Sequence, residues 1–127
     1  KKNLKTKAKI KGYTGHAHEP GWFTTAPIPA AKKLLELINW SIEEVDLWEV
    51  NEAFAVVPMA FMRELKISRE KINVNGGACS LGHPIGASGA RILISLINAL
   101  KQRELKKGVA AICIGGGEAL AIAIEVD

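Results

Sequence analysis

The sequence predicts an α/β fold, with a five-stranded mixed sheet and helices on both faces. Three observations lead to this class. Segments that alternate apolar and polar residues are separated by segments with helical spacing, an order that favours a mostly parallel sheet. The last two strand-like segments are joined by three glycines, which is typical of an antiparallel turn closing the edge of such a sheet. The chain has 127 residues, 48% of them hydrophobic, which suits one globular domain over residues 1–127.

The first third of the chain predicts one strand and one helix. Residues 8–13 alternate like a half-buried strand, and the Pro- and Gly-containing residues 19–29 indicate a loop. Pro29 suits the first turn of the helix that follows. The apolar residues expected on the buried face of this helix are Ala31, Leu34, Leu35 and Ile38. Ser41 and Glu44 have the spacing of a capping box around a single turn.

The middle of the chain predicts two more strands around a second helix. Residues 45–50 form the next strand, and residues 72–75 form a short third strand that ends at Gly76-Gly77. Between them a helix follows Asn51, and Pro58 is expected to bend it or to adjust its start. The apolar residues at helical spacing in this segment are Phe54, Val57, Phe61 and Leu65.

The last third predicts a glycine-bearing helix and two strands. The helix begins at Pro84 and contains Gly86 and Gly89. Each glycine costs a helix about 1 kcal/mol relative to Ala, so we expect another backbone to pack closely there and the helix to be buried on most faces. Residues 108–114 and 119–126 then form the antiparallel pair.

Charge and cysteine content argue against several classes of protein. Six of the seventeen basic residues lie in the first eleven positions, and the rest of the chain, with eleven basic and thirteen acidic residues, has a net charge of −2, so no nucleic-acid partner is predicted. No apolar run approaches the roughly 18 residues of a membrane span, and no secretory segment follows the lysines. Cys79 and Cys113 do not form a disulfide framework or a zinc motif, which predicts a reducing compartment, and Cys79 is interpreted as a small packing residue. Neither a dinucleotide fingerprint nor a Walker A sequence is present.

The residues that could carry chemistry fall near the carboxyl ends of the predicted strands, where α/β sheets bind ligands. Asn51 follows the second strand, and Cys113 lies near the end of the fourth. His83 directly precedes the third predicted helix, so its imidazole should be neutral and able to accept a proton. Eight of the twelve glycines lie in residues 76–89 and 115–117, where backbone is expected to pass close to a ligand.

Each of these candidates also has a structural interpretation. His83 could be a hydrogen-bonded turn residue, Cys113 an inert buried thiol, and Asn51 a helix cap. His16 and His18 alternate on one strand face and could chelate zinc together with His83. No third ligand has a fitting spacing to that pair, so no metal site is predicted.

Three sequence motifs resemble those of the thiolase family and stand in the usual order. They are NEAF at residues 51–54, GGACSLGHPIGASGAR at residues 76–91 and CIGGG at residues 113–117. The separations, 32 residues from Asn51 to His83 and 30 from His83 to Cys113, are also similar to the family's. The stretch WFTTAPIPA and the ending GGGEALAIAIEV resemble the acetoacetyl-CoA thiolases, or acetyl-CoA acetyltransferases, within that family.

The resemblance covers essentially the whole chain, although a thiolase subunit is much longer. It therefore implies that the chain corresponds to the thiolase C-terminal domain. The family's N-terminal domain supplies the nucleophilic cysteine, and an inserted loop region supplies most contacts to coenzyme A. Neither Cys79 nor Cys113 stands in the motif of that nucleophile. We therefore expect the chain alone to be inactive and, with an apolar face lacking its partner, to self-associate.

The resemblance also implies catalytic roles for His83, Cys113, Asn51 and Gly115. His83 would activate the nucleophilic cysteine and help to bind the thioester oxygen, and a water held by Asn51 would complete that oxyanion hole. Cys113 would act as acid and base at the acetyl methyl group, while the backbone amide of Gly115 would contribute to a second oxyanion hole. The expected reaction is the reversible Claisen condensation of two acetyl-CoA to acetoacetyl-CoA and CoA, with coenzyme A thioesters as substrates and no permanently bound cofactor.

Several alternatives stay open on the sequence. The chain could be a non-catalytic interaction domain of thiolase fold, or part of a thiolase for longer 3-ketoacyl-CoA chains. Ketoacyl synthases usually pair two histidines in this half, whereas Asn51 takes the place of one of them here, which favours a thiolase. The full-length protein is expected to be a homo-oligomer, a dimer or a tetramer, in the cytoplasm or in the mitochondrial matrix of a eukaryote.

Overall fold

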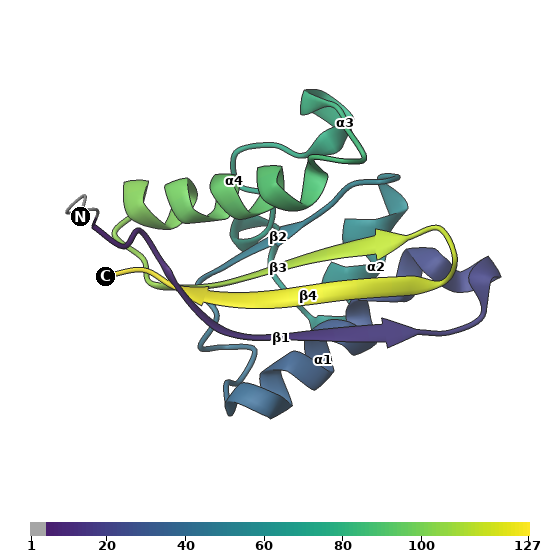
Figure 1. Ribbon diagram of the computed structural model, residues 1–127, viewed down its shortest axis with the longest axis horizontal. Coiled ribbons are helices and arrows are strands. Elements are labelled where there is room, and N and C mark those ends of the chain that lie inside the picture. Colours follow the sequence, from purple (N-terminus) through teal and green to yellow (C-terminus); the bar gives the residue numbers. More distant parts are fainter. Residues whose placement is uncertain (1–4) are drawn as a thin grey trace.

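The computed structural model describes residues 5–127 and contains a four-stranded sheet with helices on both faces (Figure 1). The strands, in the order β1-β4-β3-β2, are β1 (Lys9–Ala17), β2 (Leu47–Val50), β3 (Lys107–Ile114) and β4 (Glu118–Glu125). The helices are α1 (Pro27–Ile38), α2 (Val56–Leu65), α3 (Ala78–Leu81) and α4 (Ser88–Gln102), with the 3₁₀ turns η1 (Pro20–Thr25) and η2 (Arg69–Lys71). The α/β class is confirmed, while Lys1 and Lys2 of the basic run lie outside the described residues.

The sheet has four strands rather than five because Asn73 ends the predicted third strand. Residues 72–75 form a single bridge, between Ile72 and Trp48. Asn73 has a left-handed φ of 46°, which turns the chain out of the extended conformation. Its side-chain amide continues the pairing, accepting from the Val50 N–H at 2.8 Å and donating to the Val50 carbonyl at 2.9 Å. One asparagine side chain therefore replaces the predicted strand.

The prediction of a mostly parallel sheet is wrong. Among the described strands only β2 and β3 run parallel, because β4 is antiparallel to both β3 and β1. The predicted hairpin of β3 and β4 is confirmed, but β1 is the outer strand beside it. β1 pairs with β4 from Lys9 opposite Glu125 to Ala17 opposite Glu118. Local spacing contains no signal for a pairing between the two ends of a chain.

Two helices begin later than the sequence predicts. α2 begins at Val56, so Phe54 lies before the helix and is exposed, and Pro58 stands in the first turn. α4 begins at Ser88, because residues 84–87 form a turn in which the Pro84 carbonyl accepts from the Ala87 and Ser88 N–H groups at 2.7 and 2.8 Å. The prediction that His83 directly precedes a helix is therefore wrong.

α1 and α2 cover one face of the sheet. Trp48 of β2 and Phe61 of α2 are buried and meet edge to face, with ring centroids 5.4 Å apart. Small strand residues face α1 and let it lie close to the sheet; they include Ala111, Ala119, Ala121 and Ala123. The predicted buried face of α1 is confirmed for Ala31, Leu34 and Leu35, while Ile38 is partly buried.

α4 covers the other face only in part. Its residues Ile92, Leu96, Ala99 and Leu100 pack over Leu47 of β2 and Ala110 of β3. Beside them, over β4 and β1, lies an open apolar hollow of about 280 Å³, where Tyr13 and Leu120 are 74% and 53% exposed. The predicted burial of α4 on most faces is wrong, and nothing lies within 4 Å of a Cβ placed on Gly86 or Gly89.

Among residues 5–127 no helix is long and apolar enough to cross a membrane.

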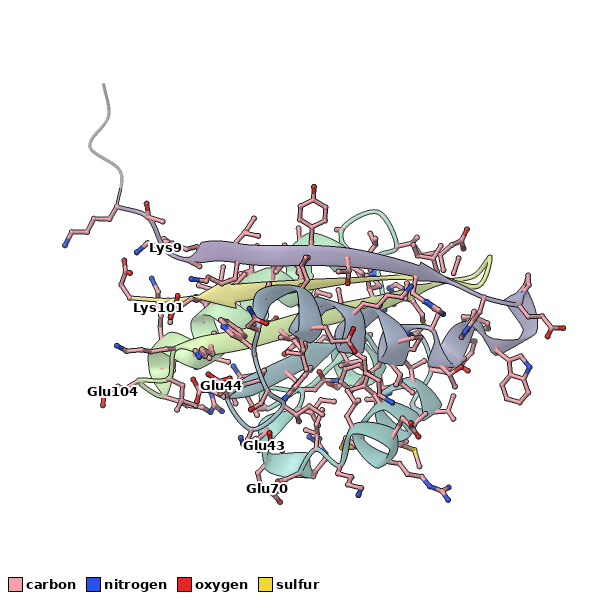
Figure 2. The ribbon with its side chains drawn as sticks, turned by 90° about the horizontal axis from the view of Figure 1, so that it is seen from below. Lys9, Glu43, Glu44, Glu70, Lys101 and Glu104 are labelled. Atoms are coloured by element: carbon pink, nitrogen blue, oxygen red, sulfur yellow. The ribbon has the colours of Figure 1, made fainter. Side chains whose placement is uncertain are left out.

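Charged side chains gather at the end of the sheet away from the β3–β4 turn, where Figure 2 shows Lys9, Glu44 and Glu104. The predicted capping box lies here and is confirmed. The Glu44 carboxylate accepts from the Ser41 N–H at 2.9 Å, and the Ser41 hydroxyl accepts from the Glu44 N–H at 3.4 Å. The opposite end of the sheet holds the carboxyl ends of the parallel strands β2 and β3.

Candidate active site

Asn51 is fixed at the carboxyl end of β2. Its backbone N–H donates to the Ala111 carbonyl of β3 at 2.9 Å, and its side chain is fully buried. It is not a helix cap, because α2 begins only at Val56 and has no side-chain cap. The Oδ1 atom accepts from Arg91 Nη2 at 2.9 Å, and Nδ2 lies 3.4 Å from His83 Nε2. Both ends of the amide are therefore engaged.

His83 is held at its other ring nitrogen by Ser88. Nδ1 lies 2.5 Å from the Ser88 hydroxyl, which donates its single proton to the Pro84 carbonyl at 3.1 Å. A hydroxyl that donates there accepts the Nδ1–H, which leaves the Nε2 lone pair facing the Asn51 amide. The imidazole is exposed while Ser88 is fully buried. His83 thus presents Nε2 as an accessible proton acceptor on a fixed support.

Arg91 of α4 connects Asn51 to a buried acid. Its Nη1 lies 3.3 Å from Glu49 Oε1, and Glu49 is only 2% exposed. Burial raises the pKa of Glu49 to about 7, the charge of Glu52 adds to the increase, and Arg91 acts in the opposite direction. Four side chains thus form a continuous connection from the interior to the exposed imidazole: Glu49, Arg91, Asn51 and His83.

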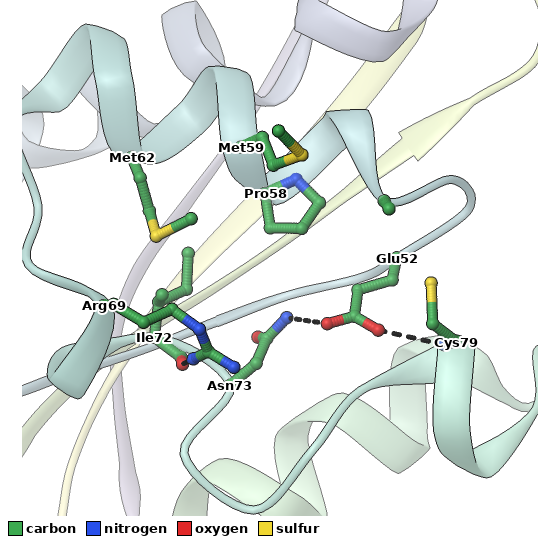
Figure 3. Close-up of a pocket in the computed structure, with 9 residues that line it drawn as sticks. Glu52, Pro58, Met59, Met62, Arg69, Ile72, Asn73 and Cys79 are labelled. Atoms are coloured by element: carbon green, nitrogen blue, oxygen red, sulfur yellow. Dashed lines mark hydrogen bonds between the residues drawn. The ribbon is translucent and has the colours of Figure 1, made fainter.

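Glu52 fastens the loop that leads to His83. Its carboxylate accepts from the Asn73 amide and from the Cys79 backbone N–H, both at 2.9 Å (Figure 3). Burial disfavours the carboxylate, but these hydrogen bonds lower the pKa of Glu52 overall. The interpretation of Cys79 as a packing residue is wrong, because its thiol is exposed beside a hollow of about 200 Å³ that Met59 also lines. Desolvation and Glu52 raise the pKa of the Cys79 thiol, which makes it a poor nucleophile.

Cys113 and Gly115 lie on the β3–β4 hairpin, at the same end of the sheet as Asn51. Cys113 is the penultimate residue of β3 and packs in the core beneath α1 and α2. Burial raises the pKa of its thiol, which favours the protonated form. Gly115 begins the exposed turn. In the part of the chain that the structure describes, no hydrogen bond joins Cys113 or Gly115 to His83.

His16 and His18 are engaged in a local hydrogen-bonded series. Lys33 Nζ lies 3.2 Å from His16 Nδ1, the two imidazoles approach to 3.4 Å, and His18 Nε2 donates to the Trp22 carbonyl at 2.7 Å. Desolvation, then Lys33 and His18, lower the pKa of His16. His83 is not part of this series. Within residues 5–127 no three His, Cys, Asp or Glu side chains form a group that could hold a metal ion.

The structure brings Asn51 and His83 together but adds three residues that the sequence reasoning missed. Ser88 and Arg91 are three apart in α4 and so share one helix face, which was a usable signal once His83 had been singled out. Glu49 is the one charged residue within the strand Leu47–Val50, whose residues are all buried. A carboxylate inside a buried strand indicates a hydrogen-bonded or charged partner. Which residue is that partner depends on how α4 packs on the sheet.

Comparisons with known proteins identify the family. A family profile described as "Thiolase, C-terminal domain" matches residues 4–126. Acetyl-CoA acetyltransferase 2 of Arabidopsis thaliana is 54% identical over 119 residues, which are 94% of this chain and 30% of that relative. A solved structure of Acat5 thiolase from Ascaris suum in complex with coenzyme A is 49% identical, with a TM-score of 0.91, over 98% of this chain and 32% of that one.

The human mitochondrial 3-ketoacyl-CoA thiolase is also similar in structure. It is 41% identical with a TM-score of 0.95, again over 98% of this chain and 32% of the other. The chain thus spans about a third of the length of the proteins it matches, and in each case nearly all of it is aligned. On this match the chain belongs to the thiolase family, in which it corresponds to the C-terminal domain.

Proposed function

We propose that this chain is the acid–base part of an acetyl-CoA acetyltransferase, which condenses two acetyl-CoA molecules reversibly to acetoacetyl-CoA and CoA. The observation that carries the proposal is the approach of the Asn51 amide to the His83 imidazole, 3.4 Å apart at the carboxyl end of β2 in a thiolase domain. Coenzyme A thioesters are the substrates, and the reaction needs no permanently bound cofactor.

His83 is assigned the role of the base. Its Nε2 removes the proton of a cysteine thiol in the N-terminal domain, and the thiolate attacks acetyl-CoA to give an acetyl-enzyme and free CoA. The exposure of the imidazole supports this role, because another domain can reach it. Buried Ser88 supports it too, because it holds Nδ1 and leaves Nε2, beside the Asn51 amide, as the proton-accepting nitrogen. A positioned base of this kind contributes about 10²–10⁴-fold in rate.

Cys113, Asn51 and Gly115 are assigned to the carbon–carbon bond. Cys113 takes a proton from the acetyl methyl group during condensation and returns one to the carbanion during cleavage. Its raised pKa supports the neutral thiol that cleavage needs. Asn51, through a bound water, and the Gly115 backbone N–H donate hydrogen bonds to oxygen atoms that gain negative charge. The loss of one such donor typically slows a reaction by about 10²–10³-fold.

The open half of the sheet is assigned to the N-terminal domain of the same protein. The hollow over β4 and β1 is apolar, as expected of a surface that is covered in the complete protein. Gly86 and Gly89 have free space beside them, so a backbone from that domain can approach closely. We also propose that the full-length protein is a homo-oligomer in the cytoplasm, where the free thiols Cys79 and Cys113 stay reduced.

The test is acetoacetyl-CoA thiolysis by the full-length protein, by this chain alone and by a full-length His83→Ala variant. The unmutated full-length protein should be active, this chain inactive, and the variant slower by about 10²–10⁴-fold. His18→Ala is the matched control, because His18 bonds the Trp22 carbonyl and not Asn51. A folded full-length protein that neither binds nor turns over acyl-CoA would replace the proposal with a non-catalytic interaction domain.

A thiolase for longer 3-ketoacyl-CoA chains is the second candidate. The likeness to the human mitochondrial 3-ketoacyl-CoA thiolase favours it. The assigned residues act on the thioester and the α-carbon, which short and long substrates share. The ratio of kcat/KM for acetoacetyl-CoA to that for a medium-chain 3-ketoacyl-CoA separates the two candidates, since a preference for the longer substrate supports the second.

A further inference from the structure

The guanidinium of Arg91 lies behind Asn51 and His83 and donates hydrogen bonds to two different side chains. Arg91 donates from Nη2 to Asn51 Oδ1 at 2.9 Å and from Nη1 to Glu49 Oε1 at 3.3 Å. It reaches both from α4, the helix whose first residue, Ser88, holds His83. Neither Arg91 nor Glu49 has a part in the chemistry proposed above.

The chemistry of the guanidinium decides the orientation of the Asn51 amide. A half-turn of an amide exchanges its oxygen and its NH₂ group, and only hydrogen-bond partners distinguish the two orientations. Arg91 has donors only, so the amide must present Oδ1 to it. Nδ2 then faces His83 Nε2 at 3.4 Å. In the opposite orientation two donors would meet at Arg91, and two acceptors would meet at His83.

We infer that Arg91 is a positioning residue that fixes the Asn51 amide with Nδ2 toward His83, and that Glu49 holds Arg91 in that place. The inference rests on the proposed function, because it concerns the same site. Arg91 acts through Asn51 and does not touch the reacting atoms.

Burial shows why the arrangement depends on these partners. Glu49 is almost fully buried, and the Arg91 side chain is 19% exposed, so water competes little for either. The Arg91 Nε atom is buried and has no hydrogen-bond partner among the described residues. The described hydrogen bonds of the guanidinium are therefore those to Glu49 and Asn51. A buried ion pair of this kind adds little net stability compared with apolar residues, which is consistent with a positioning role.

The protonation of Glu49 should affect the site. Its pKa of about 7 reflects burial first, then the opposing effects of Arg91 on α4 and of Glu52 on the loop after β2. When Glu49 takes up a proton it loses its charge and holds Arg91 less firmly. Activity should therefore fall on the acid side of neutral pH.

A double-mutant cycle in the full-length enzyme tests the inference. The variants are Arg91→Met, Asn51→Ala and the two combined, each assayed for kcat and KM in acetoacetyl-CoA thiolysis. We expect Arg91→Met to lower kcat by about 10²-fold, the loss typical of one displaced donor, with KM little changed. Because Arg91 acts through Asn51, the double variant should be no slower than Asn51→Ala alone.

Two further variants separate positioning from folding. Arg91→Lys keeps a positive charge beside Glu49 but cannot serve both acceptors with a planar fork, so thermal stability should return while kcat stays low. If Arg91→Met does not fold, Arg91→Lys takes its place in the cycle. Arg103→Met, at the other end of α4, is the matched control, because Arg103 bonds the Ala99 carbonyl and Asn75. It should leave kcat unchanged.

The outcomes distinguish this inference from the proposed function. If the unmutated enzyme is active but the losses of Arg91→Met and Asn51→Ala multiply in the double variant, the positioning role is wrong and the proposed function stands. If Glu49→Gln leaves the acid limb of the kcat profile where it was, the part assigned to Glu49 is wrong. If the unmutated protein has no thiolase activity, the proposed function fails and the inference fails with it.

Discussion

The two faces of the sheet are packed to different degrees. Beneath α1 and α2 the large side chains are enclosed, as with Trp48 against Phe61. On the other face α4 covers β2 and β3, while Tyr13 and Leu120 remain exposed over β1 and β4. The closed face holds the larger of two buried clusters, whereas the half-open face exposes apolar side chains, as a surface that receives another domain does.

The candidate site draws on both faces. Cys113 packs in the core of the closed face, whereas Arg91 and the support of His83 come from α4 on the half-open face. A stable face thus holds the proposed proton-transfer thiol, and the base is placed where a second domain can reach it. Four variants of the isolated chain test this contrast.

The largest expected effect is on the closed face. Phe61→Ala removes a fully buried ring that contacts Trp48, and we expect a loss of about 3–5 kcal/mol in the free energy of unfolding. Met59→Ala, on the exposed side of the same helix, should change it by less than about 0.5 kcal/mol. Urea unfolding of the chain measures both. Equal losses would contradict the contrast between enclosed and open packing.

A buried charge beneath α4 should make stability depend on pH. Glu49 has a pKa of about 7 in the folded chain against 4.5 for a free glutamate, so the unfolded chain releases this proton at lower pH. Rising pH therefore favours unfolding between these values, by at most about 3 kcal/mol once the pH exceeds 7. Glu49→Gln should remove this dependence. The free energy of unfolding of both proteins, measured at about pH 5 and about pH 8, tests this. If the variant keeps the same pH dependence, a group other than Glu49 causes it.

The contact between α4 and the sheet should tolerate little added volume. A Cβ on Gly108 of β3 would lie 2.9 Å from side-chain atoms of Leu96 and Leu100, so Gly108→Ala should cost about 1–3 kcal/mol. Gly89→Ala, where nothing lies within 4 Å and α4 gains a better helix former, should be neutral or raise the free energy of unfolding by up to about 1 kcal/mol. Thermal melting compares the two variants. Full tolerance at Gly108 would mean that α4 is not packed on the sheet.

The smallest effect on stability is expected in the open hollow. Leu120→Ser should change the free energy of unfolding by less than about 0.5 kcal/mol, because the side chain is half exposed. The same change should reduce self-association of the chain, measured by sedimentation velocity, because it makes the apolar surface polar. Leu37→Ser is the control, since Leu37 is also more than half exposed but lies on α1. If Leu37→Ser reduces self-association instead, the associating surface lies on the α1 side and not at the apolar hollow.

Much of the fold was predictable because most elements have local signals. The Ser41–Glu44 capping box, Pro29 in the first turn of α1 and the glycine turn after β3 are all confirmed. The errors in the sheet concern non-local pairing or a single backbone angle. The position of β1 beside β4 depends on contacts between the two ends of the chain. The loss of the fifth strand depends on the left-handed φ of Asn73, which an alternating pattern does not reveal.

The candidate site was predictable only in part. Asn51 and His83 could be expected to meet, because both follow predicted strands at one end of a sheet. The spacing of Ser88 and Arg91 places them on one helix face, but their partners could not be predicted, because the contacts depend on the turn at residues 84–87 that moves the start of α4. Cys79 was misjudged for a similar reason, since α3 turns its thiol outward. The catalytic roles of Cys113 and Gly115 stay predictions.

The side chain of Asn73 also affects how the domain behaves at high concentration. A free sheet edge can add a strand from another molecule and so start fibrous aggregation. At the β2 edge the Asn73 amide already occupies the N–H and carbonyl of Val50. At the β1 edge Lys9 and Lys11 are charged, and the register shifts between Ile10 and Gly12. Both edges therefore resist strand addition, and copies of the chain that associate through the apolar hollow should separate again on dilution.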